Sequence, residues 1–277
     1  MIKKESNKNN NIVSQTLKAI KLWFYYRKMN ILSAIEYRAN FFLILLVSSF
    51  EQIGQVLLLV ILFNQIDYIN GWGFGEVLLL SASATLVSSI VLIIIAGLGS
   101  IPYEIRTGEL DILLARPKSL YLQLAGSRLW LIDIGTLIGG IIKFIIAIVY
   151  ISISPSLIDI VLYFIALISG IVILIALTTI TMSITFFSTK VRNFFFVLYR
   201  SLGLGEYPLE IYGSGIVFLL TFILPLGFIS YYPAQALLHK GVYSQFTLFA
   251  PIIAIVFSLI ASYIWSKGVR RYTSTGS

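Results

Sequence analysis

The sequence predicts an all-α polytopic membrane protein with six transmembrane helices and cytoplasmic N- and C-termini. Two observations support this prediction. Of 277 residues, 58% are hydrophobic and only 12% are charged, which is about half the charged fraction of an ordinary soluble domain. The Lys and Arg residues gather between apolar runs, which is typical of the positive-inside pattern of membrane proteins. Lipid is therefore the expected solvent for most of the chain.

The apolar runs define the expected spans, because a bilayer core of about 30 Å takes roughly 20 helical residues to cross. Six spans are expected, over residues 41–63, 75–98, 129–152, 157–187, 215–231 and 247–266. The run 215–231 is the shortest and contains Pro225 and Gly227. With the N-terminus inside, Lys240 is the one Lys or Arg in the connections that lie outside. The whole chain, 1–277, is thus predicted to be a single transmembrane domain.

Two stretches are expected at the membrane surface rather than across it. Residues 12–31 mix Ile, Leu, Trp and Tyr with four basic side chains, a pattern that indicates an amphipathic helix lying along the inner surface. Residues 190–213 alternate aromatic residues, charges and Gly or Pro. This second stretch is therefore expected not to cross.

Motifs for nucleotide binding, metal binding and covalent catalysis are absent from the sequence. There is no GxxxxGK[ST], GxSxG or HExxH pattern, so the chain is not expected to hold ATP or a catalytic zinc ion itself. It has no Cys and a single His, His239. The basic residues are not interleaved with aromatics on a solvated face, which argues against nucleic acid as a partner. We expect no catalytic residue, cofactor or metal in this chain.

The connection 99–128 is unusually long for a link between helices. It combines charged residues with a possible apolar face of Leu110, Leu113, Leu114 and Leu120, and Pro117 interrupts it. A short amphipathic helix of this kind fits a groove on a cytoplasmic partner. The alternative is a solvated loop that lies on the lipid headgroups.

Two charges, Glu51 and Lys143, fall inside expected spans. A charge at the bilayer centre costs about 2.5–3.5 kcal/mol on insertion scales, so each is a candidate functional residue. At about 1.5 Å per residue, Glu51 lies roughly 15 Å and Lys143 roughly 21 Å from the inner end of its span. A lysine side chain can bridge that gap. Together with Gln52 and Gln55, the two charges are expected to form either a structural ion pair or part of a substrate path.

Small residues indicate where helices approach each other closely. Gly135 and Gly139 form a GxxxG motif in the third span. Such a motif allows close helix packing, either within the chain or across a dimer.

Five motifs resemble, in their order and spacing, the type-2 ABC exporter permeases. They are YRANF at 37–41, IRTGELDILLARP at 105–117, EYPLEIY at 206–212, LPLGFISYYPAQALL at 224–238 and RRYTSTGS at 270–277. More narrowly, they resemble the branch described as an uncharacterised ABC transport system permease component. The resemblance covers nearly the whole chain.

This resemblance implies a permease that pairs with a second copy or a sister permease, above separate ABC ATPase subunits that bind ATP and Mg²⁺. In that family the loop after the second span and the N-terminal interfacial helix contact the ATPase. The residues carried over as ATPase contacts are Glu104, Arg106, Gly108, Leu110, Asp111, Leu113, Arg116 and Pro117. Export is the expected direction by analogy, and the bacterial inner membrane is the expected location.

Two other classes of protein stay open. An ion-gradient-driven secondary transporter is expected to have inverted repeats and matched helix breaks, whereas this sequence has one such break and no repeat. A membrane-embedded enzyme or assembly factor needs a cluster of polar residues at one depth, for which Glu51, Gln52 and Gln55 are the candidates. A lipid-like, glycan or drug-like cargo is compatible with the sequence.

Overall fold

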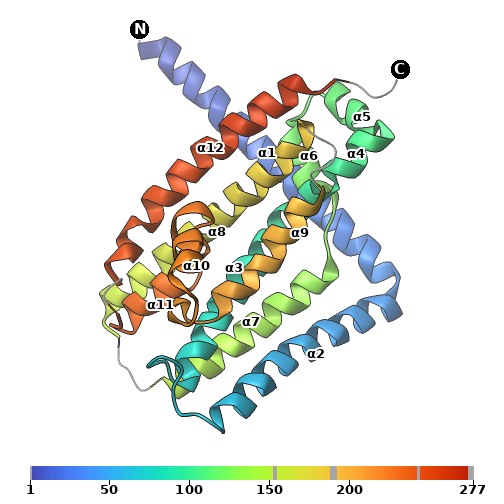
Figure 1. The fold of residues 1–277 in the computed structure, drawn as a ribbon. Coiled ribbons are helices and arrows are strands. Elements are labelled where there is room, and N and C mark those ends of the chain that lie inside the picture. The colour runs from blue at the N-terminus through green and yellow to red at the C-terminus, as the bar shows by residue number, and fades with distance from the viewer. Residues whose placement is uncertain (1, 152–154, 188–191, 242–243, 274–277) are drawn as a thin grey trace.

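The computed structural model describes residues 2–151, 155–187, 192–241 and 244–273 (Figure 1). In this part of the chain the secondary structure is helical, apart from an isolated bridge between Ile69 and Trp72. The α-helices are α1 (Ile2–Glu36), α2 (Arg38–Phe63), α3 (Phe74–Ile95), α4 (Ile101–Thr107), α5 (Glu109–Ala115), α6 (Leu120–Ser127), α7 (Leu131–Tyr150), α8 (Leu157–Ser183), α9 (Arg192–Ser201), α10 (Ser214–Phe218), α11 (Tyr231–Leu237) and α12 (Ala250–Arg271). Single-turn segments join them: η1 (Ala96–Ser100), η2 (Ile184–Phe186), η4 (Leu202–Glu206), η5 (Leu209–Ile211), η6 (Leu219–Ile223), η7 (Leu226–Phe228) and η8 (Ser244–Phe249).

Five helical stretches are long and apolar enough to cross a bilayer. They are Arg38–Phe63, Phe74–Thr107, Leu131–Tyr150, Leu157–Phe186 and Gln245–Arg271. The stretch Phe74–Thr107 extends beyond residue 98, where the sequence predicts the second span to end. Its helix is interrupted at Ile95 (φ −130°, ψ 17°), but η1 and α4 continue in helical conformation. The prediction of an all-α polytopic membrane protein is confirmed.

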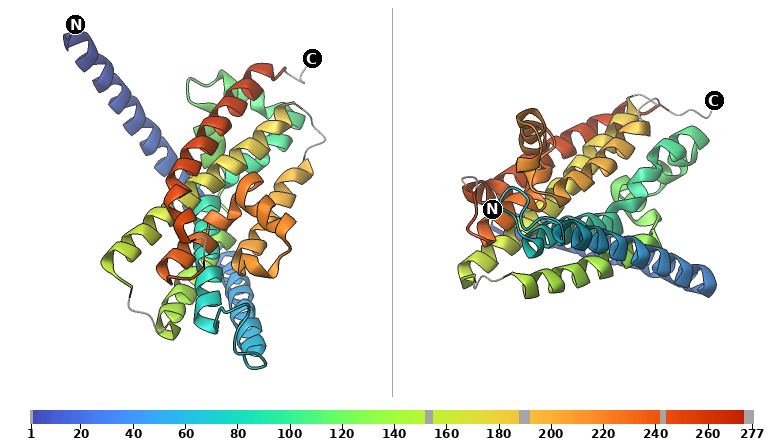
Figure 2. Two further views of the ribbon diagram at one scale, coloured as in Figure 1. Left: turned by 60° about the vertical axis from the view of Figure 1, so that its left-hand side comes forward. Right: turned by 60° about the horizontal axis from the view of Figure 1, so that its bottom comes forward.

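Helix α3 is the centre of the bundle, and α2 lies at its edge (Figure 2). The candidate span that begins with α3 is 67% buried, whereas that of α2 is 17% buried. Helix α2 packs chiefly against α7. A Cβ at Gly135 would clash with Ser48 of α2, and one at Gly139 would clash with Gln52. The GxxxG motif therefore serves packing within the chain.

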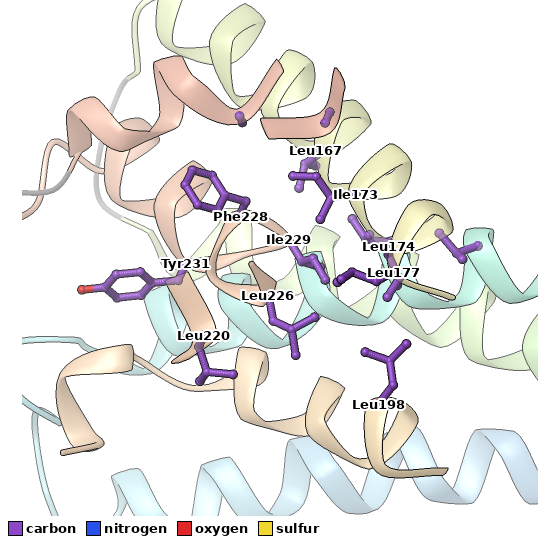
Figure 3. Close-up of a cluster of buried hydrophobic side chains, with 14 of the residues drawn as sticks. Leu167, Ile173, Leu174, Leu177, Leu198, Leu220, Leu226, Phe228, Ile229 and Tyr231 are labelled. Carbon is purple, nitrogen blue, oxygen red and sulfur yellow. The ribbon is translucent and has the colours of Figure 1, made fainter. Parts of the chain in front are cut away.

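Residues 190–213, which the sequence predicts to lie at the membrane surface and not to cross, pack partly into the bundle in the part that the structure describes. Leu198 of α9 is 5% exposed and lies with Leu174 of α8 in the apolar cluster of Figure 3. Tyr199 and Leu92 of α3 line the same cavity, while Glu206 at the end of η4 bonds Ser81. From Leu92 to Ser81 is about 16 Å along α3. The expectation of a surface segment fails for α9 and η4 because two of the charges that suggested it, Arg200 and Glu206, face a polar cleft.

The run 215–231, predicted as a span, is not one straight helix. The segments Ser214–Ile223 and Leu226–Leu237 form a pair bent by 74°, because Pro225 and its neighbours end the first helix. Its turn reaches the middle of α8, where Gly170 meets Phe228 and Ile229 (Figure 3). The chain then returns, and Lys240 pairs with Glu76 at the start of α3. Between α8 and α12 the chain therefore runs through the bundle in two pieces, first the α9–η4 segment and then this bent pair.

Helix α1 is longer than the predicted 12–31 and crosses the end of the bundle that carries α4, α5 and α6 (Figure 1). Its N-terminal half projects away from the other helices (Figure 2). It meets α2 at an elbow beside Tyr37. We call the end of the bundle with α1 and α4–α6 the inner end, and the opposite one the outer end.

Candidate functional site

A polar cleft lies among α2, α3, α7 and the α9–η4 segment, with a volume of about 270 Å³. Glu51, Gln52 and Gln55 line it from α2. Gln55 lies four residues after Glu51 and three after Gln52, and positions with these spacings are neighbours on a helix surface. The other charged residues of its lining are Asp133, Arg200 and Glu206. The structure thus brings three of the four predicted intramembrane residues to one cavity.

The fourth, Lys143, lies behind the wall of the cleft and is 1% exposed. Its Nζ donates to Gln55 Oε1 at 2.8 Å, Thr85 Oγ1 at 2.7 Å and Ser81 Oγ at 3.1 Å. An ammonium has three hydrogens, so each has an acceptor. Glu51 forms no ion pair with it among the described residues. The predicted Glu51–Lys143 ion pair is therefore not made, because Lys143 of α7 reaches α3 and the nearer amide of α2 instead.

Sequence reasoning missed Glu206, Arg200 and Asp133 as members of this site. The Ser81 hydroxyl donates to Glu206 Oε2 at 3.3 Å, a contact that is not expected if 190–213 lies at the membrane surface. Arg200 was hidden for the same reason. Asp133 lies near the inner end of its span, where a charge costs little, so the sequence gives no sign that it belongs to a site. The structure shows that it lines the same cavity as Glu51, Arg200 and Glu206.

A second, mainly apolar cavity of about 380 Å³ adjoins the cleft toward the inner end. Leu92, Ala96 and Trp130 are among its lining residues. It shares Asp133 and Tyr199 with the polar cleft. A polar and an apolar compartment therefore lie side by side between α3 and α7.

The predicted coupling loop is a folded unit of three short helices at the inner end. Gly108 joins α4 to α5 in the left-handed region (φ 75°, ψ 1°), which a glycine adopts without strain. The Gln123 side chain donates to the carbonyls of Leu113 and Lys118, at 3.0 and 3.2 Å, and so fixes the turn before α6. Glu104 is buried and pairs with Arg128 at 3.6 Å.

The residues carried over as ATPase contacts divide into a buried and an exposed group. Glu104 and Leu110 are buried, so they shape the loop. The exposed members are Arg106, Arg116 and Pro117, while Gly108, Asp111 and Leu113 are half-buried. The apolar face predicted from sequence is also divided, since Leu110 and Leu120 point inward while Leu114 is 40% exposed.

Arg27 fastens α1 to this loop. Its guanidinium, in a residue only 5% exposed, donates to the carbonyls of Ile94, Ala125 and Arg128 at 2.6–2.7 Å. The Ile94 carbonyl is available because α3 breaks at the next residue. Burial lowers the pKa of Arg27 to about 10, and the charge of Asp133 opposes that effect, so the side chain stays a cation at neutral pH. Helix α1, the end of α3 and α6 therefore form one block.

Comparison with known proteins agrees with this architecture. A family model described as ABC-2 family transporter protein matches residues 49–276, a range that includes the cleft and the inner loop. Searches of curated proteins and of solved structures found no match. Proteins of this family are membrane components of ABC transport systems, associate with ABC ATPases and are not themselves catalytic. The chain is a multi-pass membrane protein that belongs to the ABC-2 family of transporter proteins.

Proposed function

We propose that this chain is the permease subunit of an ABC exporter, in which two permease subunits enclose the substrate path. Separate ATPase subunits bind ATP and Mg²⁺ and supply the energy. The observation that supports this most directly is the polar cleft inside an apolar bundle, since polar groups within the membrane mark substrate pathways. The N- and C-termini face the cytoplasm of a bacterial cell, and the chain lies in the inner membrane.

The inner loop is the proposed contact with the ATPase. Arg106, Ile112, Leu114 and Arg116 are exposed on it and supply both charge and apolar area. A force on this loop reaches α3 through the carbonyls of Ile94 and Arg128 that Arg27 holds. Helix α3 carries Thr85 and Ser88 of the cleft. Movement of the block formed by α1, α3 and α6 would thus change the shape of the cleft.

A second copy, or a sister permease, is the proposed cover for the open side of the cleft. Glu51 is exposed near the middle of α2, the least buried of the long helices. An uncompensated carboxylate facing lipid at this depth is costly. A neighbouring permease that packs against α2 and α9 removes it from lipid and completes the path.

Co-purification tests the assignment. The chain is expressed with its neighbouring genes, extracted in mild detergent, and the bound proteins are identified. We expect a P-loop ATPase with the wild type and at least about tenfold less with Arg106→Glu plus Arg116→Glu. Lys267→Glu is the matched control, because Lys267 is exposed on α12 outside the loop. Absence of an ATPase from the wild-type preparation, together with ion-driven flux, would contradict the proposal and favour a secondary transporter.

Orientation has its own test, because the chain has no Cys. Single substitutions Tyr68→Cys, in the exposed turn before α3, and Ser119→Cys, before α6, are labelled with a membrane-impermeant maleimide. We expect labelling of the first in intact cells and of the second only after permeabilisation. The reverse result would invert the proposed topology.

A further inference from the structure

We propose that the polar cleft binds a cationic group rich in hydrogen-bond donors, such as the ammonium of an amphiphilic amine. This inference rests on the proposed function, because it names the class of substrate that the permease carries. Three features of the structure point to this class: the hydrogen-bonding capacity of the lining, the charges that reach the cleft and the neighbouring apolar cavity.

The Ser and Thr hydroxyl groups of the cleft present acceptors rather than donors. Ser88 donates its hydrogen to Ala84 O at 2.7 Å, and Thr136 donates to Ile132 O at 2.9 Å. A hydroxyl has one hydrogen and two lone pairs. Once the hydrogen is committed to the helix backbone, only lone pairs remain for a ligand.

Gln52 adds an acceptor that is already desolvated. It is 5% exposed and lines the cleft, and its Oε1 is buried with no hydrogen-bond partner among the described residues. A buried acceptor without a donor costs about 1–3 kcal/mol. A turn of the Gln52 side chain that brings this oxygen to the cleft, where a ligand offers an N–H, recovers that cost.

The charged lining of the cleft consists of three carboxylates, from Glu51, Asp133 and Glu206, and one cation, Arg200, so it favours a cation. Glu51 is exposed on the lining and has no ion-pair partner among the described residues, and Glu206 uses one oxygen for Ser81. The cations nearby are less available. Lys143 is buried with its three hydrogens committed, and Arg27 is committed to backbone carbonyls. Arg200 is the one basic residue in the lining, and it stacks over Phe196.

The cation that fits is organic rather than a metal. In the described part of the chain no group of three or more His, Cys, Asp and Glu residues is placed to hold a metal ion. The adjoining cavity of about 380 Å³ is mainly apolar, with Leu92, Ala96 and Trp130 in its lining, and it shares Asp133 and Tyr199 with the cleft. An apolar body in that cavity and an ammonium in the cleft satisfy both compartments.

A series of probes with one tail and different heads tests this inference. The purified full chain, with its co-purified ATPase, is reconstituted in nanodiscs of zwitterionic lipid. Binding of radiolabelled octylammonium, octyltrimethylammonium, octanol and octanoate is measured against empty discs. We expect octylammonium to bind most tightly, octyltrimethylammonium more weakly because it lacks N–H donors, and octanoate not at all above the empty discs.

Three variants assign the binding to the cleft. Glu51→Gln should weaken octylammonium binding at least about tenfold, the effect of one charge-assisted hydrogen bond. Gln52→Leu should weaken it by a smaller factor and serves as a second, independent variant. Asp67→Asn removes a carboxylate from the exposed outer turn and should change nothing.

The inference is overturned if octanoate binds as tightly as octylammonium, if no probe binds above empty discs, or if Glu51→Gln binds like the wild type. These results leave the permease assignment intact whenever the ATPase still co-purifies. Conversely, if octylammonium binds in a Glu51-dependent way but no ATPase co-purifies, the proposed binding site stands and the assignment as an ABC permease subunit is contradicted.

Discussion

The buried cation at the inner end of the bundle, Arg27, and the buried cation in its middle, Lys143, have different kinds of hydrogen-bond acceptor. Arg27 donates to the backbone carbonyls of Ile94, Ala125 and Arg128. Lys143 donates to the side-chain oxygens of Gln55, Ser81 and Thr85. Backbone carbonyls at a helix break or helix end have few other donors within reach. Side-chain oxygens can turn toward a new partner at little cost.

The difference separates a rigid joint from an adaptable site. At the inner end, η1 and α6 meet closely enough that a Cβ at Gly97 would clash with the Leu124 carbonyl, and a Cβ at Gly126 of α6 would press on Tyr26 of α1. In the middle, a cavity of about 270 Å³ adjoins the residues that bind Lys143. A transporter needs both properties, since force must pass through a joint and substrate must pass through a site that changes shape.

Removal of Arg27 is expected to have the largest effect. Arg27→Met removes the side-chain donor of the Ala125 and Arg128 carbonyls, while the Ile94 carbonyl keeps only its longer bond from Trp23 Nε1. Hydrogen bonds to a charged group are worth about 1.5–3 kcal/mol each. We expect a loss of at least about 3 kcal/mol in the free energy of unfolding, measured by tryptophan fluorescence in detergent. Lys28→Met, at the exposed neighbouring position, should stay within about 0.5 kcal/mol. Equal effects of the two variants would contradict a joint at Arg27.

An added methyl group between α2 and α7 should have an intermediate effect. Gly139→Ala forces its Cβ into Gln52, and overpacking of this kind costs about 1–3 kcal/mol. Gly54→Ala is the matched control on α2, because nothing lies within 4 Å of its Cβ. We expect that control to be neutral or stabilising by up to about 1 kcal/mol, since Ala favours a helix. The same unfolding assay compares the two.

Lys143→Met should have a smaller effect than either change, which sharpens the contrast with Arg27. Lys143 forms no salt bridge with another described residue, so its removal breaks no ion pair and recovers the cost of burying an ammonium. Thr85 keeps its bond to the Ser81 carbonyl, and the Ser81 hydroxyl keeps its bond to Glu206. We expect a change within about 1 kcal/mol. A loss above about 3 kcal/mol would make Lys143 a structural joint like Arg27.

The fold was largely predictable from the sequence, and the site was only partly so. A long apolar run is a local feature of the sequence, so composition and length alone predict α2, α3, α7, α8 and α12. The α9–η4 segment does not, because its charges are compatible with either a membrane surface or a polar cleft. Only tertiary contacts distinguish the two, such as the one between Ser81 and Glu206, 125 positions apart in the sequence.

The intramembrane charges illustrate the same limit at the level of single residues. Depth along a helix is predictable at about 1.5 Å per residue, and it placed Glu51 and Lys143 close enough to pair. The direction in which each helix faces is not set by depth. Lys143 turns toward α3, where Ser81 and Thr85 provide acceptors, while Glu51 lines the cleft.

The smallest expected effect is the coupling between Glu51 and Lys143. In a double-mutant cycle with Glu51→Gln and Lys143→Met, we expect the two changes to add within about 0.5 kcal/mol. The two residues share no hydrogen-bond partner, and the charge of Glu51 is exposed and acts on Lys143 only weakly. Lys143 and Glu206 share the hydroxyl of Ser81, so the matched cycle with Glu206→Gln should show the larger coupling. If Glu51 instead couples to Lys143 by more than about 1 kcal/mol and Glu206 does not, the two charges pair in another conformation of the transporter. Lys143 would then leave its three acceptors during the transport cycle, and its place behind the wall of the cleft would be one of two positions.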